Sequence, residues 1–246
     1  MTDAILLIVA ALIVGASKGG LASAAAIAVP MLALFMNPVK AAAILLPVYI
    51  VTDWVGVYLY RKDYSPRNLQ ILVPSILLGV GIATVITPYT PESALLVFTG
   101  AIGLWHCARS WLKRADEGKA EARVLPGVFW GTLTGIASFI THSGAPPSQA
   151  YLLPQKLPKL EFAGTIAIAF AVGNLVKLPA YWYIGQLDGL NWGLVAALAA
   201  AGIAGTVIGR FATRRLSEAV YVKVIQGMLL ILSVVLLVRG GIEMFA

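Results

Sequence analysis

The sequence predicts an all-α integral membrane protein. Of its 246 residues, 59% are hydrophobic and only 12% are charged, and the mean hydropathy is +0.86. A soluble domain has about a quarter charged residues. Apolar runs of about 18 or more residues recur along the whole chain, and each is long enough to cross a bilayer. Barrel strands alternate over roughly 10 residues, so these longer, unbroken runs indicate helices.

The apolar segments form two similar series on either side of a charged linker, "KRADEGKAEAR" (113–123). In each series, two short segments precede three long ones. We expect segments over 4–16, 20–36, 40–60, 68–87, 92–112, 124–140, 145–155, 160–184, 190–210 and 217–238. The sequence therefore predicts a first membrane repeat over 1–112, a cytoplasmic linker over 113–123 and a second membrane repeat over 124–246.

An ungapped shift of 124 positions places the first series on the second. A hydroxyl group, a side chain able to carry positive charge, a small residue and a glycine then recur in the same order. The aligned pairs are Ser17 with Thr141, Lys18 with His142, Gly19 with Ser143, Gly20 with Gly144, and Pro30 with Pro154. This order, together with the similar segment lengths, predicts an internal repeat.

Lys and Arg cluster in some loops and are missing from others. Clusters lie at 61–67, 109–123, 156–159 and 210–215, whereas the loops 87–91 and 185–190 contain no Lys or Arg. The positive-inside rule places all four clusters in the cytoplasm.

This placement requires the region 124–155 to begin and end on the same side, as a re-entrant hairpin or as two short spans. By the repeat, 4–36 does the same from the opposite face. Each repeat then has a broken pair of short helices plus three long transmembrane helices. The two repeats are inverted relative to one another, with both termini outside, an architecture that recurs in secondary transporters.

The short segments are interrupted at membrane depth, in "GASKGGL" (15–21) and "THSGAPP" (141–147). Glycines let a chain leave helical geometry, and prolines suit the first turn of a new helix. We expect one half-helix to start near Gly20 and another near Gly144. Each start presents unpaired N–H groups and the positive end of a helix dipole, and these features bind anions.

The predicted anion site combines backbone N–H groups, hydroxyl and amide donors, and positive charge. The candidate substrate-binding residues are Ser17, Lys18, Gly19, Gly20, Thr141, His142, Ser143, Gly144, Asn174 and Lys177. Structural alternatives exist for each type: close helix packing for glycine and a helix–helix hydrogen bond for Asn174, bonding back to the preceding turn for hydroxyls, snorkelling for the lysines, and a satisfied interior position for the histidine.

Asp53 and Lys177 lie within long apolar segments, where ionisable residues are costly and functional by default. The same shift aligns them with one another. They either pair across a pseudo-two-fold axis or bind a proton and an anion separately. Asp53 and His142 are the candidate proton-coupling groups. Asn174 lies three residues before Lys177 and therefore shares its helix face.

Few features point to chemistry beyond binding. The single cysteine, Cys107, excludes an internal disulfide and a cysteine metal cluster. We find no Gly-x-Ser-x-Gly elbow, no paired metal-binding histidines and no redox cysteine pair. The net charge of +7 is explained by short loops and does not indicate nucleic acid. We expect no metal, no cofactor and no enzymatic activity, with a membrane-embedded enzyme as the less favoured alternative.

The stretch 135–187 resembles the TauE/SafE sulfite-exporter family, also called the TSUP family. The matching features are His-Ser-Gly-Ala-Pro-Pro at 142–147, Tyr-Leu-Leu-Pro-Gln at 151–155, Gly164-Thr165, and Asn174 with Lys177-Leu178-Pro179. The first repeat fits more loosely, through "GASKGGL" and Pro30. Members of the family often have a longer glycine run there, part of which is occupied by Ser17 and Lys18 in this chain.

The resemblance implies a multi-pass transporter of the bacterial cytoplasmic (inner) membrane for small sulfur-containing anions, such as sulfite, sulfoacetate or another sulfonate, or thiosulfate. We expect an exporter that works by alternating access. An anion channel or an importer of another small oxyanion is the alternative. The negative interior potential drives anions outward, whereas uptake needs proton coupling or its equivalent. The sequence makes no prediction of oligomeric state.

Overall fold

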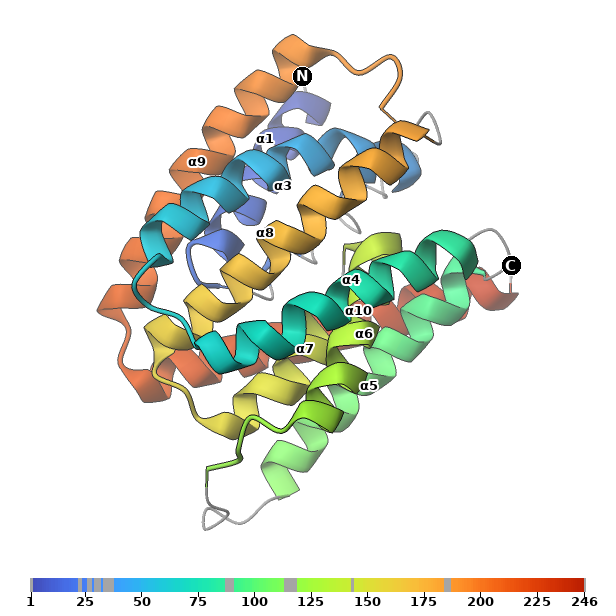
Figure 1. Cartoon of the computed structure of the whole chain (residues 1–246). Coiled ribbons are helices and arrows are strands. Elements are labelled where there is room, and N and C mark those ends of the chain that lie inside the picture. The colour runs from blue at the N-terminus through green and yellow to red at the C-terminus, as the bar shows by residue number, and fades with distance from the viewer. Residues whose placement is uncertain are drawn as a thin grey trace. The chain divides into compact units, whose positions relative to one another are not determined.

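The computed structural model describes residues 2–21, 24–25, 28, 32, 38–86, 91–112, 119–142, 144–183 and 187–245. Every regular element within these residues is a helix, which confirms the predicted all-α class (Figure 1). Among them, the helices long and apolar enough to cross a membrane contain the spans Ala43–Tyr60, Pro66–Ile86, Lys159–Trp182, Trp192–Arg215 and Ala219–Met244. The chain is therefore a multi-pass membrane protein.

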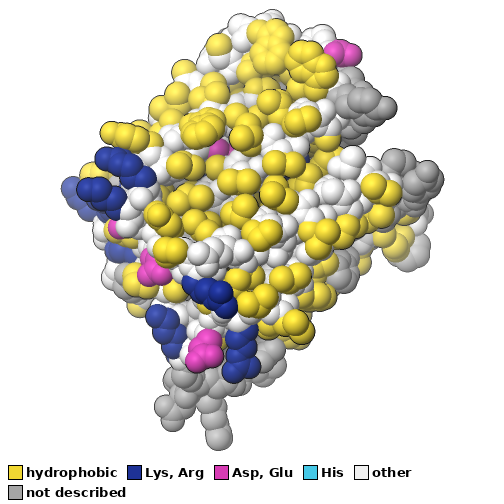
Figure 2. Space-filling model, in the orientation of Figure 1, with side chains coloured by type: hydrophobic (Ala, Val, Ile, Leu, Met, Phe, Trp, Pro, Cys, Tyr) yellow, Lys and Arg dark blue, Asp and Glu magenta, His cyan; other side chains and the backbone are white. Residues whose placement is uncertain are grey.

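Two of the expected segments differ from the spans above. The expected long segment 92–112 forms helix α5 (Glu92–Leu112), which is not among the five spans because polar residues lower its hydropathy. The expected short segment 20–36 lies mostly outside the described residues, although Ala25, Ala28 and Leu32 within it are helical. Figure 2 shows hydrophobic side chains over much of the viewed face, as expected for a surface in contact with lipid.

The chain divides into two compact units. Unit 1 combines Met1–Ser65 with Lys159–Ser217, and unit 2 combines Pro66–Pro158 with Glu218–Ala246. Each unit therefore takes helices from both halves of the sequence. The predicted repeats concern sequence order and not packing, so the division of the chain at 113–123 stays a prediction.

Unit 1 contains α1 (Thr2–Lys18), α3 (Pro38–Tyr60), α8 (Lys159–Tyr183) and α9 (Trp192–Arg215). Helix α1 packs along α9, and α3 packs against α1, α8 and α9. Glycines allow the closest approach: a Cβ atom at Gly205 would clash with the carbonyl of Leu12, and one at Gly209 with the carbonyl of Ala16. The backbones of α1 and α9 are therefore in direct contact, as small residues permit between membrane helices.

Unit 2 contains α4 (Pro66–Ile86), α5, α6 (Val124–Thr141), α7 (Ala145–Leu152), the short 3-10 helix η2 (Leu153–Gln155) and α10 (Glu218–Phe245). Helix α4 pairs with α6, and α5 pairs with α10. Glycines again make the contacts: a Cβ atom at Gly79 would clash with the carbonyl of Thr132, and one at Gly100 would lie 2.7 Å from the carbonyl oxygen of Ser233. All eight residues of α7 are buried.

Helices α6 and α7 form a hairpin that returns to its starting side. Tyr151 Oη donates to the carbonyl of Arg123 at 3.1 Å, and the Ala120 amide donates to the carbonyl of Pro154 at 3.0 Å. The region 124–155 therefore begins and ends at the same end of unit 2, as predicted. Helix α7 is about 12 Å long, too short for a bilayer core of about 30 Å. Helices α6 and α7 therefore form a hairpin, and its placement in the membrane, as a re-entrant hairpin or as two short spans, stays a prediction.

Positively charged segments meet at one end of unit 1. Lys159 Nζ donates to the carbonyls of Arg214, at 3.4 Å, and Leu216, and Arg210 Nη2 lies 3.0 Å from Asp63 Oδ2. The loop after α3, the start of α8 and the end of α9 therefore lie together. This confirms, within unit 1, that these clusters share a side; the assignment of that side to the cytoplasm stays a prediction.

Candidate anion-binding site

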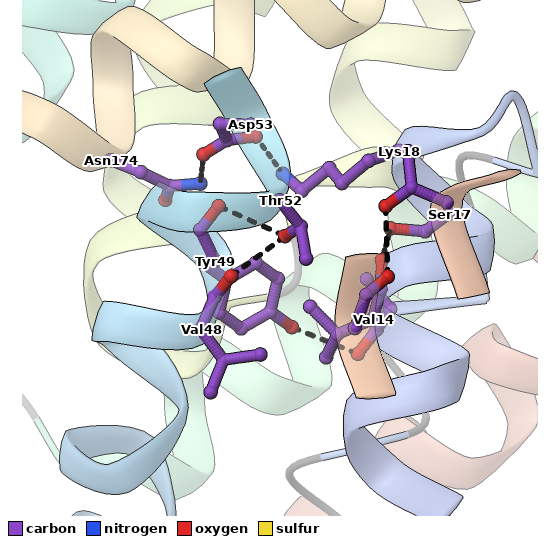
Figure 3. A network of polar contacts seen from close by, with 11 residues as sticks. Val14, Ser17, Lys18, Val48, Tyr49, Thr52, Asp53 and Asn174 are labelled. Atoms are coloured by element: carbon purple, nitrogen blue, oxygen red, sulfur yellow. Dashed lines mark hydrogen bonds and ion pairs between the residues drawn. The ribbon is translucent and has the colours of Figure 1, made fainter. Parts of the chain in front are cut away.

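Two buried, oppositely charged side chains meet inside unit 1. Lys18, the last residue of α1, is 5% exposed, and Asp53, within α3, is 2% exposed. Lys18 Nζ lies 2.6 Å from Asp53 Oδ1 (Figure 3). The sequence alignment of the repeats suggested Lys177 as a partner for Asp53, but its direct ion pair is with Lys18.

The second carboxylate oxygen of Asp53 is bound from a third helix. Asn174 Nδ2, on α8, donates to Asp53 Oδ2 at 2.7 Å (Figure 3). This is the helix–helix hydrogen bond that was the structural alternative for Asn174, and it also places this residue in the charged cluster. One carboxylate is thus held by an ammonium group from α1 and an amide group from α8.

Lys177 adds a second positive charge to this region. It is 0% exposed, which excludes snorkelling, and it interacts electrostatically with Asp53 and Lys18. The ionised forms of Lys18, Lys177 and Asp53 together have a net charge of +1. Buried charges need compensation, so the Lys18–Asp53–Asn174–Lys177 cluster is a candidate site for an anion.

Aromatic rings surround the ammonium group of Lys18. Its Nζ atom lies 5.0 Å from the centre of the Tyr49 ring and 5.4 Å from that of the Phe170 ring. Cation–π contacts of this kind stabilise a cation that has lost its water. Tyr49 is itself fixed, because its hydroxyl donates to the carbonyl of Ala25 at 3.1 Å.

The residues around Lys18 differ from the expected helix start. The Gly19 amide donates to the Gly15 carbonyl at 3.0 Å, and the Gly20 amide donates to the Ser17 carbonyl at 3.2 Å. These bonds close the C-terminus of α1, where Gly20 adopts a φ of +126°. The N–H groups of both glycines are therefore paired at the end of α1, and most of the residues after Leu21, where the predicted half-helix would begin, lie outside the described residues. The positive charge of Lys18 compensates the negative end of the α1 dipole.

The other candidates at this break follow their structural alternatives. Ser17 Oγ donates back to the carbonyl of Val14 at 2.7 Å. A Cβ atom at Gly19 would clash with the backbone of α9 at Thr206 and would lie 2.5 Å from the Arg210 amide nitrogen. Gly19 therefore serves close helix packing between α1 and α9.

The second break lies in unit 2 and fits the prediction more closely. Helix α6 ends at Thr141, and His142 is a buried residue with a φ of +53° whose amide donates to the carbonyl of Ala137. Helix α7 then begins after Gly144 with two prolines in its first turn, which confirms the predicted helix start. Ser143 and the side chain of Thr141 lie outside the described residues.

The structure thus brings together Lys18, Asp53, Asn174 and Lys177 within unit 1, whereas His142 and Gly144 belong to unit 2. It also adds a residue that sequence reasoning treated only as a loop charge. Arg210 lies in α9 and is 7% exposed. The only signal in the sequence is that Arg210 lies one helical turn before Arg214 and directly after an apolar stretch.

Comparison with known proteins identifies the family. A family model described as sulfite exporter TauE/SafE matches residues 7–236. Among curated proteins and among solved structures, none matches the chain. The matched range contains the whole Lys18–Asp53–Asn174–Lys177 cluster and both breaks, so the family assignment covers the candidate site as well as the fold. The chain therefore belongs to the TauE/SafE sulfite exporter family.

Proposed function

We propose that this membrane protein exports a small sulfur-containing anion, such as sulfite, a sulfonate or thiosulfate, across the bacterial cytoplasmic membrane by alternating access. The family match supports a sulfur anion as substrate. The observation that carries the proposal is the buried cluster in unit 1, in which Lys18 and Asp53 form an ion pair within apolar helices. Ionisable groups at such depth mark substrate and ion pathways.

The proposed substrate takes the donors that Asp53 now occupies. An oxyanion offers oxygen atoms like those of a carboxylate, and it can accept from the Lys18 ammonium group and the Asn174 amide group. Lys177 supplies further positive potential, because it is fully buried beside them. Lys18 and Asn174 hold the Asp53 carboxylate in the structure. The carboxylate therefore competes with the substrate for these two groups.

Competition between Asp53 and the substrate couples transport to protons. When Asp53 takes up a proton it loses its charge and releases Lys18, so protonation favours anion binding. Among the described residues, the ionisable side chains around Asp53 include Lys18 from α1, Lys177 from α8 and Tyr49 from α3 itself. His142, at the second break, is the alternative coupling group.

The remaining candidate residues lie at the two chain breaks. Ser17, Gly19 and Gly20 form the polar break in unit 1, whereas Thr141, Ser143 and Gly144 belong to the break in unit 2 and stay candidates from the sequence. Inverted repeats are supported by the helix pairings, because α1 pairs with α9 in unit 1 and the corresponding α6 pairs with α4 in unit 2. Both termini are then outside, and the linker is cytoplasmic.

The first test is anion-dependent thermal stabilisation of the purified protein. A ligand that binds only the folded state stabilises it by about 2.7 kcal/mol at 100 times its Kd. We expect sulfite, thiosulfate or sulfoacetate to raise the unfolding temperature of the wild type and of Lys223→Ala, which removes an exposed lysine. Lys18→Ala and Lys177→Met should lose this response.

Flux measurements then separate carrier from channel. In proteoliposomes, saturable efflux of the stabilising anion supports alternating access, whereas large currents that do not saturate would indicate a channel. If no sulfur anion stabilises the wild type, or if the two cluster variants respond as the wild type does, the proposed site is wrong.

A further inference from the structure

The chain passes between unit 1 and unit 2 three times, at Ser65–Pro66, Pro158–Lys159 and Ser217–Glu218. Each connection is short: α4 begins at Pro66 itself, α8 begins four residues after η2 ends, and α10 begins three residues after α9 ends. Motion between compact units is absorbed by a few loop or terminal residues. These three connections are therefore the places where the backbone takes up any motion of one unit against the other.

On the unit 1 side, the first two turns of α8 hold the other two connections. Thr165 Oγ1 accepts a hydrogen bond from the amide of Ser65 at 2.9 Å. Lys159 Nζ donates to the carbonyl of Leu216, beside the third connection. All three connections thus leave unit 1 at the same end, and two side chains of one helix fix them there.

The hydroxyl group of Thr165 makes two hydrogen bonds. Its Oγ1 donates to the carbonyl of Glu161 at 2.7 Å and accepts from the Ser65 amide, and both Thr165 and Ser65 are buried. The neighbouring Gly164 allows this approach, because a Cβ atom there would clash with the carbonyl of Asp63. Gly164 and Thr165 are among the features that resemble the TauE/SafE family, yet neither belongs to the charged cluster of unit 1.

On the unit 2 side, an amide pair fixes two of the connections. Asn68, in the first turn of α4, and Gln155, the last residue of η2, exchange two hydrogen bonds, of 2.9 and 3.1 Å. Both side chains are buried, and Gln155 Nε2 also donates to the carbonyl of Tyr151 at 3.2 Å. Side chains therefore hold the chain on both sides of these connections, which confines a change of backbone angles to the few residues between.

Helix α8 joins this end of unit 1 to the proposed anion site. Thr165 lies near its start, and Asn174 and Lys177 lie about 14 and 18 Å further along the same helix. A helix moves largely as a rigid rod, so a rotation at its first turns displaces the amide and ammonium groups that surround Asp53.

We propose that the first two turns of α8 form the pivot about which unit 1 and unit 2 turn during transport, and that Thr165 is a positioning residue that holds this pivot. This inference rests on the proposed anion transport, because alternating access is largely rigid-body motion of one part of a transporter against another. Thr165 does not touch the substrate and acts through Ser65.

Transport kinetics test the role of Thr165. Thr165→Val removes the acceptor of the Ser65 amide and Thr165→Ser keeps it, whereas Thr134→Val removes a buried hydroxyl that donates to the carbonyl of Trp130 in its own helix. We expect Thr165→Val to lower the kcat of sulfite efflux by about tenfold, the equivalent of one hydrogen bond, with KM unchanged. Thr165→Ser should restore kcat, and Thr134→Val should keep it.

Distances between spin labels test the pivot itself, in Cys107→Ser protein in lipid nanodiscs. Val85→Cys and Asp188→Cys place labels far from the connections, at the end of α4 and beyond the end of α8, whereas Arg67→Cys and Arg214→Cys place them beside the connections. We expect a broad distance distribution for the first pair, which sulfite shifts, and a narrow one for the second pair, which sulfite leaves unchanged. Thr165→Val should broaden the second distribution, and Thr134→Val should not.

Three results would overturn the pivot. The first is a distance between the labels at 67 and 214 that changes as much as the distance between those at 85 and 188. The second is a narrow distribution for both pairs, with sulfite and without it. The third is an equal loss of kcat in Thr165→Val and Thr134→Val, which would leave Thr165 with only a structural role.

The distribution widths also separate failure of the pivot from failure of the proposed function. They are measured without any ligand, so they decide the pivot even for a protein that does not bind sulfite. A broad first distribution and a narrow second one, in a protein that sulfite neither stabilises nor shifts, would refute the proposed substrate and retain the pivot.

Discussion

Lys18 Nζ and Asp53 Oδ1 lie 2.6 Å apart and are almost completely buried, on helices that are separated in sequence by the break after Lys18. Removing one partner of a buried ion pair leaves an uncompensated charge, whereas replacing both is often neutral. The stability cost of breaking this pair therefore comes from the buried charge that is left without a partner. The pair also connects α1 to α3, so the proposed anion binding and the packing of unit 1 depend on the same contact.

Lys18→Met should lower the free energy of unfolding by about 3 kcal/mol, because the Asp53 carboxylate stays buried without its main partner. Lys18→Met combined with Asp53→Asn should recover most of that loss. Thermal unfolding in detergent measures both effects, with Lys223→Met as the exposed control. A double variant no more stable than Lys18→Met would show that packing of the lysine stem, and not its charge, is what matters.

Asp53→Asn should make sulfite efflux insensitive to a pH gradient, because an amide cannot take up a proton. Net efflux down the sulfite gradient should persist, since Lys18 is no longer held by a carboxylate. Efflux from proteoliposomes under imposed pH gradients measures this, with His142→Asn as the comparison. If His142→Asn removes the pH dependence and Asp53→Asn retains it, proton coupling belongs to the second break.

Gly79→Ala and Gly81→Ala form a matched pair on α4. A Cβ atom at Gly79 would clash with the carbonyl of Thr132 on α6, whereas one at Gly81 has nothing within 4 Å among the described residues. Overpacking a tight contact costs about 1–3 kcal/mol, and alanine favours a helix over glycine by about 1 kcal/mol. Gly79→Ala should lower the unfolding temperature and Gly81→Ala should not. Equal effects would contradict the close α4–α6 contact.

His142→Gly should be more stable than His142→Ala, because His142 adopts a φ of +53°. A left-handed conformation costs a residue other than glycine about 1–2 kcal/mol, and both variants lose the same imidazole. Comparison of their unfolding temperatures isolates the cost of the left-handed backbone conformation at position 142. Identical temperatures would mean that the turn between α6 and α7 relaxes to another conformation when the imidazole is absent.

Local signals explain which parts of the site were predictable. The start of α7 follows from two prolines after Gly144, and this information lies within a few residues. Asp53 and Lys177 were identified because charged residues in apolar runs are visible in the sequence. The Lys18 partner of Asp53 was not predicted, because contacts between helices depend on their rotation and depth, and the repeat alignment offered Lys177 only as one of two alternatives.

The glycine pair and Arg210 show two further limits. Glycine is common at helix ends and at close helix contacts, so Gly19 and Gly20 did not distinguish the end of α1 from the start of another helix. Rules for membrane topology count the charge of Arg210 but carry no information about burial. Its contact with Asp63 joins α9 to the loop after α3, and this neighbour is set by the packing of unit 1.

The composition of the two units has a consequence for biogenesis. Unit 1 needs α9 and unit 2 needs α10, so neither can close until the ribosome has made almost the whole chain. The early helices of each unit are therefore synthesised before the helices that they pack against. Lys18 and Asp53 both emerge long before α8, and they can neutralise one another during this interval. Lys177 is the last member of the cluster to be synthesised, because it lies on α8. Asn174 lies on the same helix, and its side chain donates to the earlier-synthesised Asp53.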